Sequence, residues 1–245
     1  MKDKIALVTG ASSGIGAATA QLLAREGVVV AAVARRADRL NDLVKGIEAA
    51  GGRGAAFAAD ITTESEADSV ARQILARFGR IDILVNSAGI IRPGGAEASD
   101  PAHWREMIDI NLLATMYLSR SVLPGMRERG DGHIVVVSST AGRNVGAGNV
   151  GYFASKHAVN AFAEGMRQEV AGFGIRVTIV EPGATTTEVA DSIPDPATRT
   201  LMVTHVSKEG SMRSEDVGGA IVYALKQPPN VNIREIWIAP TAAVR

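Results

Sequence analysis

The chain has 245 residues, of which 46% are hydrophobic, and it contains no cysteine. Its 26 Lys and Arg residues equal its 26 Asp and Glu residues, so it lacks the basic excess typical of nucleic-acid-binding proteins. The absence of cysteine excludes a disulfide scaffold, a zinc ribbon and a thiol nucleophile. The longest apolar run, residues 28–34, is too short to cross a bilayer, and no signal-peptide core follows Met1. We therefore expect a cytoplasmic protein with neither a membrane nor a nucleic-acid partner.

Seven short runs, most of them rich in β-branched residues, alternate with longer segments of helical periodicity, such as 15–26 and 38–50. The predicted strands are residues 5–8, 28–33, 54–58, 81–85, 133–137, 175–180 and 233–238. Their continuously apolar character is typical of a sheet that is buried on both faces. The pattern predicts a Rossmann-like, doubly wound, seven-stranded parallel α/β sheet with helices on both faces. No linker or repeat divides the chain, so we expect a single domain over residues 1–245.

Two segments interrupt this alternation of strands and helices. Residues 92–100 are rich in Gly, Pro and Ala, and residues 184–213 contain many Thr and Ser with only weak periodicity. Long irregular segments in compact domains are usually binding loops or lids. We expect residues 184–213 to form a substrate lid, the alternative being a mobile surface loop without a role.

Residues 9–16 read Thr-Gly-Ala-Ser-Ser-Gly-Ile-Gly, directly after the first predicted strand and at the start of a helix. Gly10, Gly14 and Gly16 would allow a tight turn and let backbone amides approach a pyrophosphate at the helix N-terminus. No Gly-Lys-Ser/Thr follows, so the segment is not a P-loop. A dinucleotide site is the favoured interpretation, and a glycine-rich turn without a ligand is the alternative.

The end of the second predicted strand indicates which dinucleotide would bind. An acidic residue there would hold the ribose hydroxyls of NAD, whereas arginine accommodates the 2′-phosphate of NADP. The chain has Arg35 and Arg36 at this point, and no acid before Asp38. Guanidinium groups offer bidentate phosphate contacts, so the sequence favours NADP(H) over a merely solvated basic turn.

Tyr152 and Lys156 lie four residues apart at the predicted start of a helix that continues to about Gly172. This spacing places both side chains on one helix face. The ordinary pKa of a phenol is about 10, and a neighbouring ammonium would lower it enough for acid–base chemistry. Ser139, thirteen residues upstream, follows the fifth predicted strand at the edge where such sheets bind ligands. Turn formation is the alternative role for Ser138 and Ser139.

These features together resemble the short-chain dehydrogenase/reductase family, in the same order and spacing over nearly the whole chain. The matching residues are 9–16, Asp60, Ile61, 86–89, Asn111, Ser139, Tyr152, Lys156, Pro182 and Gly183. The resemblance implies that Tyr152 is the general acid/base and that Lys156 lowers its pKa and binds the nicotinamide ribose. It implies further that Ser139 holds the substrate oxygen and that Asn111 supports a water in a proton relay.

The resemblance also implies an NADP(H) site in which Asp60 and Ile61 contact adenine, while Thr185 and Thr187 meet the nicotinamide carboxamide. The full set of expected cofactor residues is Gly10, Ser12, Ser13, Gly14, Ile15, Gly16, Arg35, Arg36, Asp60, Ile61, Asn86, Ala88, Gly89, Tyr152, Lys156, Pro182, Gly183, Thr185 and Thr187. One departure is Ser87, where the family usually has asparagine, which puts any hydrogen bond of that asparagine in doubt.

Residues 180–188 and 235–241 are similar to the branch containing clavulanic acid dehydrogenase and NADP-dependent 3-hydroxy acid (serine) dehydrogenases. The expected reaction is hydride transfer between NADP(H) and a small aldehyde, ketone or hydroxy acid. Reduction of a 3-ketoacyl thioester is an alternative, and a non-catalytic NADP-sensing protein is another. The intact set of Asn111, Ser139, Tyr152 and Lys156 argues against the sensor.

The remaining predictions concern subunit contacts, histidines and tryptophans. The stripes 112–122 and 158–166 are apolar beyond one helix face, which favours a homotetramer, or a dimer, assembled through these helices. His103, His133, His157 and His205 show no metal-ligand spacing, so we expect no metal site. Trp104 and Trp237 lie in apolar stretches, and we expect both to pack in the interior.

Overall fold

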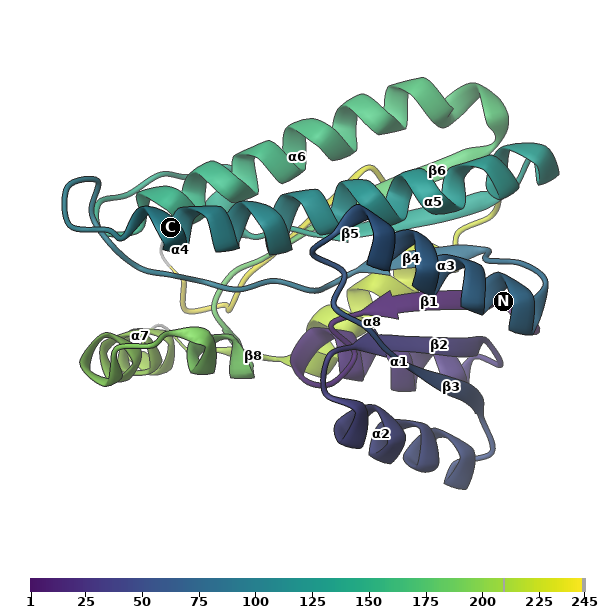
Figure 1. The fold of residues 1–245 in the computed structure, drawn as a ribbon, viewed down its shortest axis with the longest axis horizontal. Coiled ribbons are helices and arrows are strands. Elements are labelled where there is room, and N and C mark those ends of the chain that lie inside the picture. Colours follow the sequence, from purple (N-terminus) through teal and green to yellow (C-terminus); the bar gives the residue numbers. More distant parts are fainter. Residues whose placement is uncertain (209, 244–245) are drawn as a thin grey trace.

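The computed structural model describes residues 1–208 and 210–243. Seven parallel strands form one sheet in the order β3-β2-β1-β4-β5-β6-β9, which confirms the predicted fold class (Figure 1). The strands are β1 (Ile5–Thr9), β2 (Val29–Ala34), β3 (Arg53–Ala58), β4 (Ile83–Asn86), β5 (Gly132–Val137), β6 (Ile175–Pro182) and β9 (Glu235–Ile238). The strand order reverses beside β1, which pairs with β2 on one side and with β4 on the other. Ligands bind at such a reversal, beyond the carboxyl ends of the strands.

Two strands, β4 and β9, begin two residues later than predicted. Before β4, the carboxylate of Asp82 accepts from the amide of Ile5 at 2.8 Å. Before β9, the carbonyl of Ile233 accepts from the hydroxyl of Thr178 at 2.6 Å. At both places the side-chain bond adds to a backbone bond, from the Asp82 amide to the Ile5 carbonyl at 2.9 Å and from the Ile179 amide to the Arg234 carbonyl at 2.8 Å.

Successive strand residues point to opposite faces of the sheet and pack under different helices (Figure 1). On β1, Leu7 packs with residues of three helices, namely α3 (Glu64–Phe78), α5 (Ala114–Arg129) and α6 (Val150–Val170). The next residue, Val8, packs on the other face with residues of α1 (Gly14–Arg25), α2 (Ala37–Ala49) and α8 (Ser214–Leu225). Both faces are therefore buried, as the continuously apolar strands predict.

Helix boundaries near the carboxyl edge differ from the predictions. Helix α6 begins at Val150 rather than Tyr152 and ends at Val170, so Tyr152 lies within its first turn. Between α4 (Pro101–Met107) and α5, residues Ile108–Leu113 form a π-helix. Such wide turns are frequent at functional sites, and this one contains Asn111.

The segment 184–213 is more ordered than its weak periodicity suggests. It contains β7 (Thr185–Thr186), a 3₁₀ helix (Glu188–Ser192), helix α7 (Pro196–Lys208) and β8 (Met212–Arg213). Asp195 accepts from the amide of Thr198 at 2.7 Å and so caps the start of α7. Helix α7 lies apart from the sheet, and Leu201 on it is 71% exposed (Figure 1). The side chains of residues 196–204 bury no continuous face, so this stretch needs no amphipathic period, which is why the sequence did not predict the helix.

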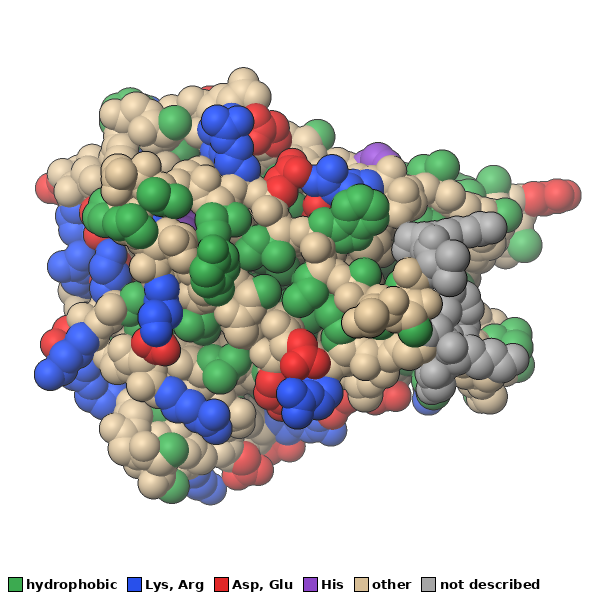
Figure 2. Space-filling view, turned by 180° about the vertical axis from the view of Figure 1, so that it is seen from behind, with side chains coloured by type: hydrophobic (Ala, Val, Ile, Leu, Met, Phe, Trp, Pro, Cys, Tyr) green, Lys and Arg blue, Asp and Glu red, His purple; other side chains and the backbone are tan. Residues whose placement is uncertain are grey.

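The surface carries a further correction. Trp237 does not pack in the interior, since it is 56% exposed on the edge strand β9, with the Arg143 guanidinium 5.8 Å from its ring centroid. Basic and acidic side chains are interspersed over the face shown in Figure 2. Among the described helices, none combines the length and apolar character that a membrane span requires.

Two glycines provide a matched test of this packing. A Cβ at Gly16 in α1 would lie 2.5 Å from the carbonyl oxygen of Gly10, whereas a Cβ at Gly46 in α2 meets no atom within 4 Å. We expect Gly16→Ala to lower the free energy of unfolding by about 1–3 kcal/mol. Gly46→Ala should raise it by about 0.5–1 kcal/mol. Urea denaturation measures both, and a Gly16→Ala protein as stable as the wild type would contradict the close approach.

Candidate active site

A cleft of about 690 Å³ lies at the carboxyl edge of the sheet, where the strand order reverses. Its walls come from the loop after β1, the ends of β2, β4, β5 and β6, and the segment after Pro182. Every expected cofactor residue except Asn86 lines this cleft, and so do Ser139 and Ser138. Residues that lie more than 170 positions apart in the sequence thus share one cavity.

The loop between β1 and α1 approaches neighbouring backbone too closely for side chains. Gly10 has φ +64°, and a Cβ there would lie 2.8 Å from the carbonyl oxygen of Ser87. Ser13, which precedes α1, makes no side-chain capping bond. The amides of the first turn therefore face the cleft without a side-chain acceptor, as in helix N-termini that bind phosphate.

Thr9 fixes the loop after β4 against the glycine loop. Its Oγ1 accepts from the amides of Ser87 at 2.9 Å and Ala88 at 3.1 Å. Asn86 points away from the cleft instead, and its Nδ2 donates to Ser119 Oγ at 3.3 Å. A role for Asn86 in holding the cofactor is therefore not supported, because alternation along β4 turns its side chain toward α5.

The two arginines after β2 lie in different environments. Arg36 Nη2 donates to Ser12 Oγ at 2.8 Å and to Ser13 Oγ at 2.7 Å, and Arg36 Nη1 contacts Glu188 at 2.9 Å. Arg35 is exposed in the cleft wall and makes no hydrogen bond or ion pair with any part of the chain that the structure describes. Both arginines line the cleft, and the Arg36 guanidinium contacts the glycine loop.

Ser139, Tyr152 and Lys156 come together at the inner end of the cleft. Ser139 ends the loop after β5, and its Oγ accepts from the amide of Ala141 at 3.1 Å. Tyr152 is partly buried, and its phenol hydrogen-bonds with the Ser139 side chain. One helical turn further on, Lys156 Nζ donates to the carbonyl of Val137 at 3.1 Å. A hydroxyl, a phenol and an ammonium therefore line one small volume.

Burial is the largest influence on the pKa values of Tyr152 and Lys156. Burial raises the pKa of Tyr152, and the hydrogen bond with Ser139 offsets part of that rise. Burial also lowers the pKa of Lys156 to about 8. The expectation that Lys156 depresses the pKa of Tyr152 is not met in this structure. Nζ is 5.9 Å from the phenol ring centroid and donates to a backbone carbonyl instead.

A buried carboxylate holds the turn that carries Ser139. Glu181 on β6 is fully buried and accepts from Arg143 Nε at 2.5 Å and from Asn160 Nδ2 at 2.7 Å. Asn160 Nδ2 also donates to the carbonyl of Gly142 at 3.1 Å, at the end of the 3₁₀ turn Thr140–Gly142. These contacts hold the turn against β6 on one side and α6 on the other. They thereby fix the position of the Ser139 hydroxyl.

Asn111 lies behind the cleft wall rather than in it. Its Oδ1 accepts from the amide of Ile90 at 2.8 Å, and its Nδ2 donates to the Ile90 carbonyl and to Ser155 Oγ, both at 3.1 Å. A Cβ at Gly89 would lie 3.3 Å from Asn111 Oδ1 and 3.8 Å from Lys156 Nζ. The side chain of Asn111 thus positions the backbone beside Lys156.

The segment 184–203 covers the inner end of the cleft. Ile91, Ala190 and Ile193 form an apolar cluster against which Tyr152 and Met202 pack. Ser192 Oγ donates to the carbonyl of Ile91 at 3.2 Å. Sequence reasoning missed the cleft residues Glu188 and Ile91. The sequence offered one signal for Glu188, namely its position directly after the three threonines 185–187.

The part of the chain that the structure describes holds no group of three or more potential metal-ligating side chains. His133 is buried, its Nε2 lies 2.8 Å from Thr178 Oγ1, and burial lowers its pKa to about 3. His157 Nδ1 lies 2.8 Å from the carbonyl of Phe153. The prediction for the His205 side chain falls outside the described residues.

The sequence profile described as short chain dehydrogenase matches residues 4–197. The chain belongs to the short-chain dehydrogenase/reductase family. An uncharacterized oxidoreductase of Staphylococcus saprophyticus is 35% identical, with 98% of each chain covered. The glycine betaine reductase ATRR of Emericella nidulans is 39% identical over 98% of this chain, which spans only 19% of that longer protein.

Solved structures of this family share the fold. The closed form of a serine dehydrogenase complexed with NADP⁺ has a TM-score of 0.91 and 31% identity, covering 98% of this chain and 96% of that one. An alcohol dehydrogenase from the archaeon Thermococcus sibiricus, complexed with 5-hydroxy-NADP, has a TM-score of 0.86 and 26% identity, with 97% and 96% covered. The predicted family and fold are thereby confirmed, and the chain is an oxidoreductase of a family that uses nicotinamide cofactors.

The depressed pKa of Lys156 makes a prediction for stability. Between pH 8 and 10 the unfolded chain keeps this proton while the folded chain releases it, so stability should rise with pH in this window. Lys156→Met removes the titrating ammonium group, so its stability should lack this contribution to the pH dependence. The wild type should therefore gain up to about 1.4 kcal/mol of unfolding free energy per pH unit relative to Lys156→Met.

Urea denaturation at pH 8, 9 and 10 measures this difference. Lys45→Met, at an exposed lysine of α2, is the control. The window stops at pH 10 because the raised pKa of Tyr152 opposes the trend above that value. A wild-type minus Lys156→Met difference that stays constant over this range would contradict the buried, depressed lysine.

Proposed function

We propose that the protein is an NADP(H)-dependent oxidoreductase that interconverts a small carbonyl compound and its alcohol. The observation that carries the proposal is one continuous cleft. It has Ser139, Tyr152 and Lys156 at its inner end, and the glycine loop with Arg35 and Arg36 at its outer end. The phenol and the arginines thus serve the two ends of one bound dinucleotide.

The residues fit this cofactor. Gly10 and Gly16 let the glycine loop pack directly on the backbone of Ser87 and of Gly10, and this close packing shapes the edge at the N-terminus of α1 where a pyrophosphate would bind. Arg35, Arg36, Ser12 and Ser13 offer donors to a 2′-phosphate. Asp60 and Ile61 would meet the adenine, and Lys156 the nicotinamide ribose. Pro182, Gly183, Thr185 and Thr187 would border the nicotinamide. When bound, NADP(H) supplies or accepts the hydride.

The side chains of the protein handle the accompanying proton. Burial raises the pKa of Tyr152, so its phenol is protonated at neutral pH and can donate to a carbonyl oxygen in reduction. Ser139, hydrogen-bonded with Tyr152, would hold the same oxygen. Lys156 would stabilise the phenolate once the proton has left. In oxidation the phenolate accepts the alcohol proton.

The apolar cluster of Ile91, Ala190 and Ile193 over Tyr152 supports the role of residues 184–213 as a substrate lid. The relatives named above include a serine dehydrogenase, an alcohol dehydrogenase and a glycine betaine reductase, so they favour a small substrate without selecting one. Rates with a panel of aldehydes, ketones and acyl thioesters distinguish a small-carbonyl reductase from a 3-ketoacyl thioester reductase. Absence of turnover throughout the panel would favour the NADP-sensing alternative.

Tyr152→Phe tests the proton-transfer role. The substitution removes only the phenolic hydroxyl, so we expect turnover to fall at least 10²- to 10⁴-fold while NADPH affinity is kept. Tyr223→Phe, at an exposed tyrosine of α8, is the matched control and should leave both quantities unchanged. Steady-state rates and fluorescence titration of NADPH measure the effect. Near-normal turnover of Tyr152→Phe would exclude the assignment.

The cofactor preference is tested by titrating both reduced cofactors against the wild type and Arg35→Ala. Each charge-assisted hydrogen bond contributes about 1.5–3 kcal/mol, so the 2′-phosphate should favour NADPH about ten- to a thousandfold after screening. Arg35→Ala should weaken NADPH far more than NADH. The preference should shrink as salt rises. Equal wild-type affinity for the two cofactors would refute the preference for NADP(H).

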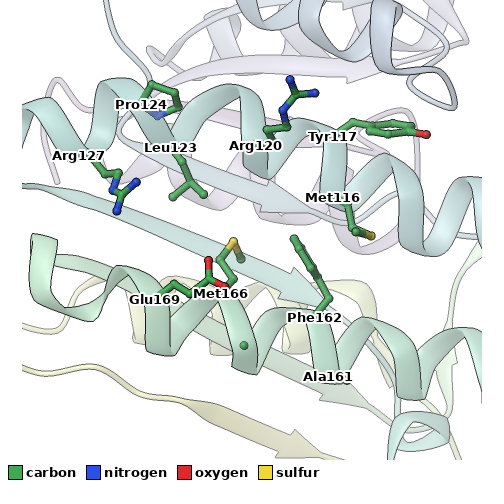
Figure 3. A pocket seen from close by; sticks show the side chains of 11 residues that line it. Met116, Tyr117, Arg120, Leu123, Pro124, Arg127, Ala161, Phe162, Met166 and Glu169 are labelled. Carbon is green, nitrogen blue, oxygen red and sulfur yellow. The ribbon is translucent and has the colours of Figure 1, made fainter.

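We also propose that the protein assembles through α5 and α6, as a tetramer or a dimer. An apolar pocket of about 670 Å³ lies between these helices. Figure 3 shows the side chains of Leu123, Phe162 and Met166 pointing into it. Arg127 on α5 and Glu169 on α6 border it. A two-fold contact is self-complementary, and this border offers one basic and one acidic side chain to it.

Ala161→Glu places a charge on this exposed border of α6 and should lower the mass measured by light scattering. Ala76→Glu, at an exposed alanine of α3, is the control and should leave the mass unchanged. A wild type that is monomeric at micromolar concentration, or an oligomer insensitive to Ala161→Glu, would contradict this interface.

A further inference from the structure

Glu188 joins the two walls of the cleft at its outer end. It begins the 3₁₀ helix Glu188–Ser192, and its Oε2 accepts from Arg36 Nη1 at 2.9 Å. Arg39 Nη1 donates to both of its carboxylate oxygens, at 2.5 and 2.6 Å. The three side chains are 40–45% exposed. We call this cluster of Glu188, Arg36 and Arg39 the latch.

The latch lies where the proposed function needs an anion. Arg36 also donates to the hydroxyls of Ser12 and Ser13 on the glycine loop. The Glu188 carboxylate therefore occupies the guanidinium of Arg36, which would help to hold a 2′-phosphate. The hydrogen bonds from Arg39 and Arg36 lower the pKa of Glu188 to about 2, so the carboxylate is charged at neutral pH.

The latch also holds the segment that precedes α7. A Cβ at Gly14 would lie 3.3 Å from Thr187 Cβ, so the residue next to Glu188 rests against the glycine loop. Four residues beyond Glu188, Ser192 bonds to Ile91 beside Tyr152. A change at the outer end of the cleft can thus be transmitted along one short helix to its catalytic end.

We propose that Glu188 determines cofactor specificity by acting as an internal substitute for the 2′-phosphate. Its carboxylate holds Arg36 and Arg39 until the phosphate replaces it, and this replacement releases Glu188–Ser192 from the outer wall. NADP(H) would then both bind and unlatch the lid, whereas NAD(H) would leave the latch closed. The inference rests on the proposed preference for NADP(H).

Glu188→Gln removes the competing charge and keeps the size of the side chain. Without the Glu188 carboxylate, the latch presents a net charge of +2 to the phosphate, from Arg36 and Arg39, instead of +1. Exposed ion pairs contribute a few-fold each to an equilibrium constant, so we expect 2′,5′-ADP to bind about three- to tenfold tighter at low salt. Binding of 5′-ADP, which has no 2′-phosphate, should stay unchanged.

The control is Glu26→Gln, which makes the same charge change in an exposed ion pair with Lys226 at the far end of α1. It should leave the affinities for both nucleotides unchanged. Calorimetric titration of 2′,5′-ADP and 5′-ADP against the three proteins at low and high salt measures these affinities. The gain of Glu188→Gln should shrink at high salt, because the latch is exposed.

Two results would overturn the proposal. In one, Glu188→Gln binds 2′,5′-ADP no tighter than the wild type does. In the other, it loses only affinity for 5′-ADP, which would mean that Glu188 accepts a ribose hydroxyl, as acidic residues do in NAD sites. A wild type that binds both nucleotides equally would instead refute the preference for NADP(H), and the latch proposal with it.

Hydrogen exchange tests the coupling to the lid separately. Because 2′,5′-ADP lacks the nicotinamide, it reports on the latch alone. Its addition to the wild type should speed exchange of the amides in Glu188–Ser192, and Glu188→Gln should show that faster exchange without nucleotide. Exchange that is equally slow in all these states would show that Glu188 does not restrain the segment.

Discussion

The structure depends on one constraint, namely that the parallel sheet is buried on both faces. Since Leu7 and Val8 pack into different hydrophobic clusters, the central strands have no solvent-facing side on which to carry polar chemistry. Functional groups can be placed only where strands end, and parallel strands all end at the same edge. The glycine loop after β1, the arginines after β2 and Ser139 after β5 therefore meet in one cleft.

Buried polar contacts then give this edge its precision. Thr9 fixes the loop after β4, Asn111 holds the Ile90 backbone, and Glu181 holds the turn that carries Ser139 through Arg143 and Asn160. Each group is nearly or fully buried and finds its partners on a different element. A buried polar group without a partner costs free energy, so these bonds fix the relative positions of the elements. The side chains of Ser139, Tyr152 and Lys156 are therefore held in fixed relative positions.

The sequence predicted what local pattern determines and missed what tertiary contact determines. The sheet follows from buried β-branched runs. Ser139, Tyr152 and Lys156, whose spacing in the sequence suggested a common site, lie close together in the structure. Helix α7 was missed because its residues 196–204 bury no continuous face. The burial that raises the pKa of Tyr152 exists only in the folded chain. The pairing of Glu188 with Arg36 also needs the fold, because the two residues lie 152 positions apart in the sequence. Asn86 matched a motif, but the alternation along β4 turns it away from the cleft.

The central claim, that this cleft joins hydride transfer to proton donation by Tyr152, is tested most directly by isotope tracing. The protein is incubated with a small ketone or aldehyde and NADPH deuterated at C4 of the nicotinamide, and the alcohol is analysed by mass spectrometry. The account predicts one deuterium on the carbinol carbon, while the hydroxyl proton exchanges with water. Alcohol formed without deuterium from either C4-labelled form of NADPH, or no alcohol from any tested carbonyl compound, would contradict it.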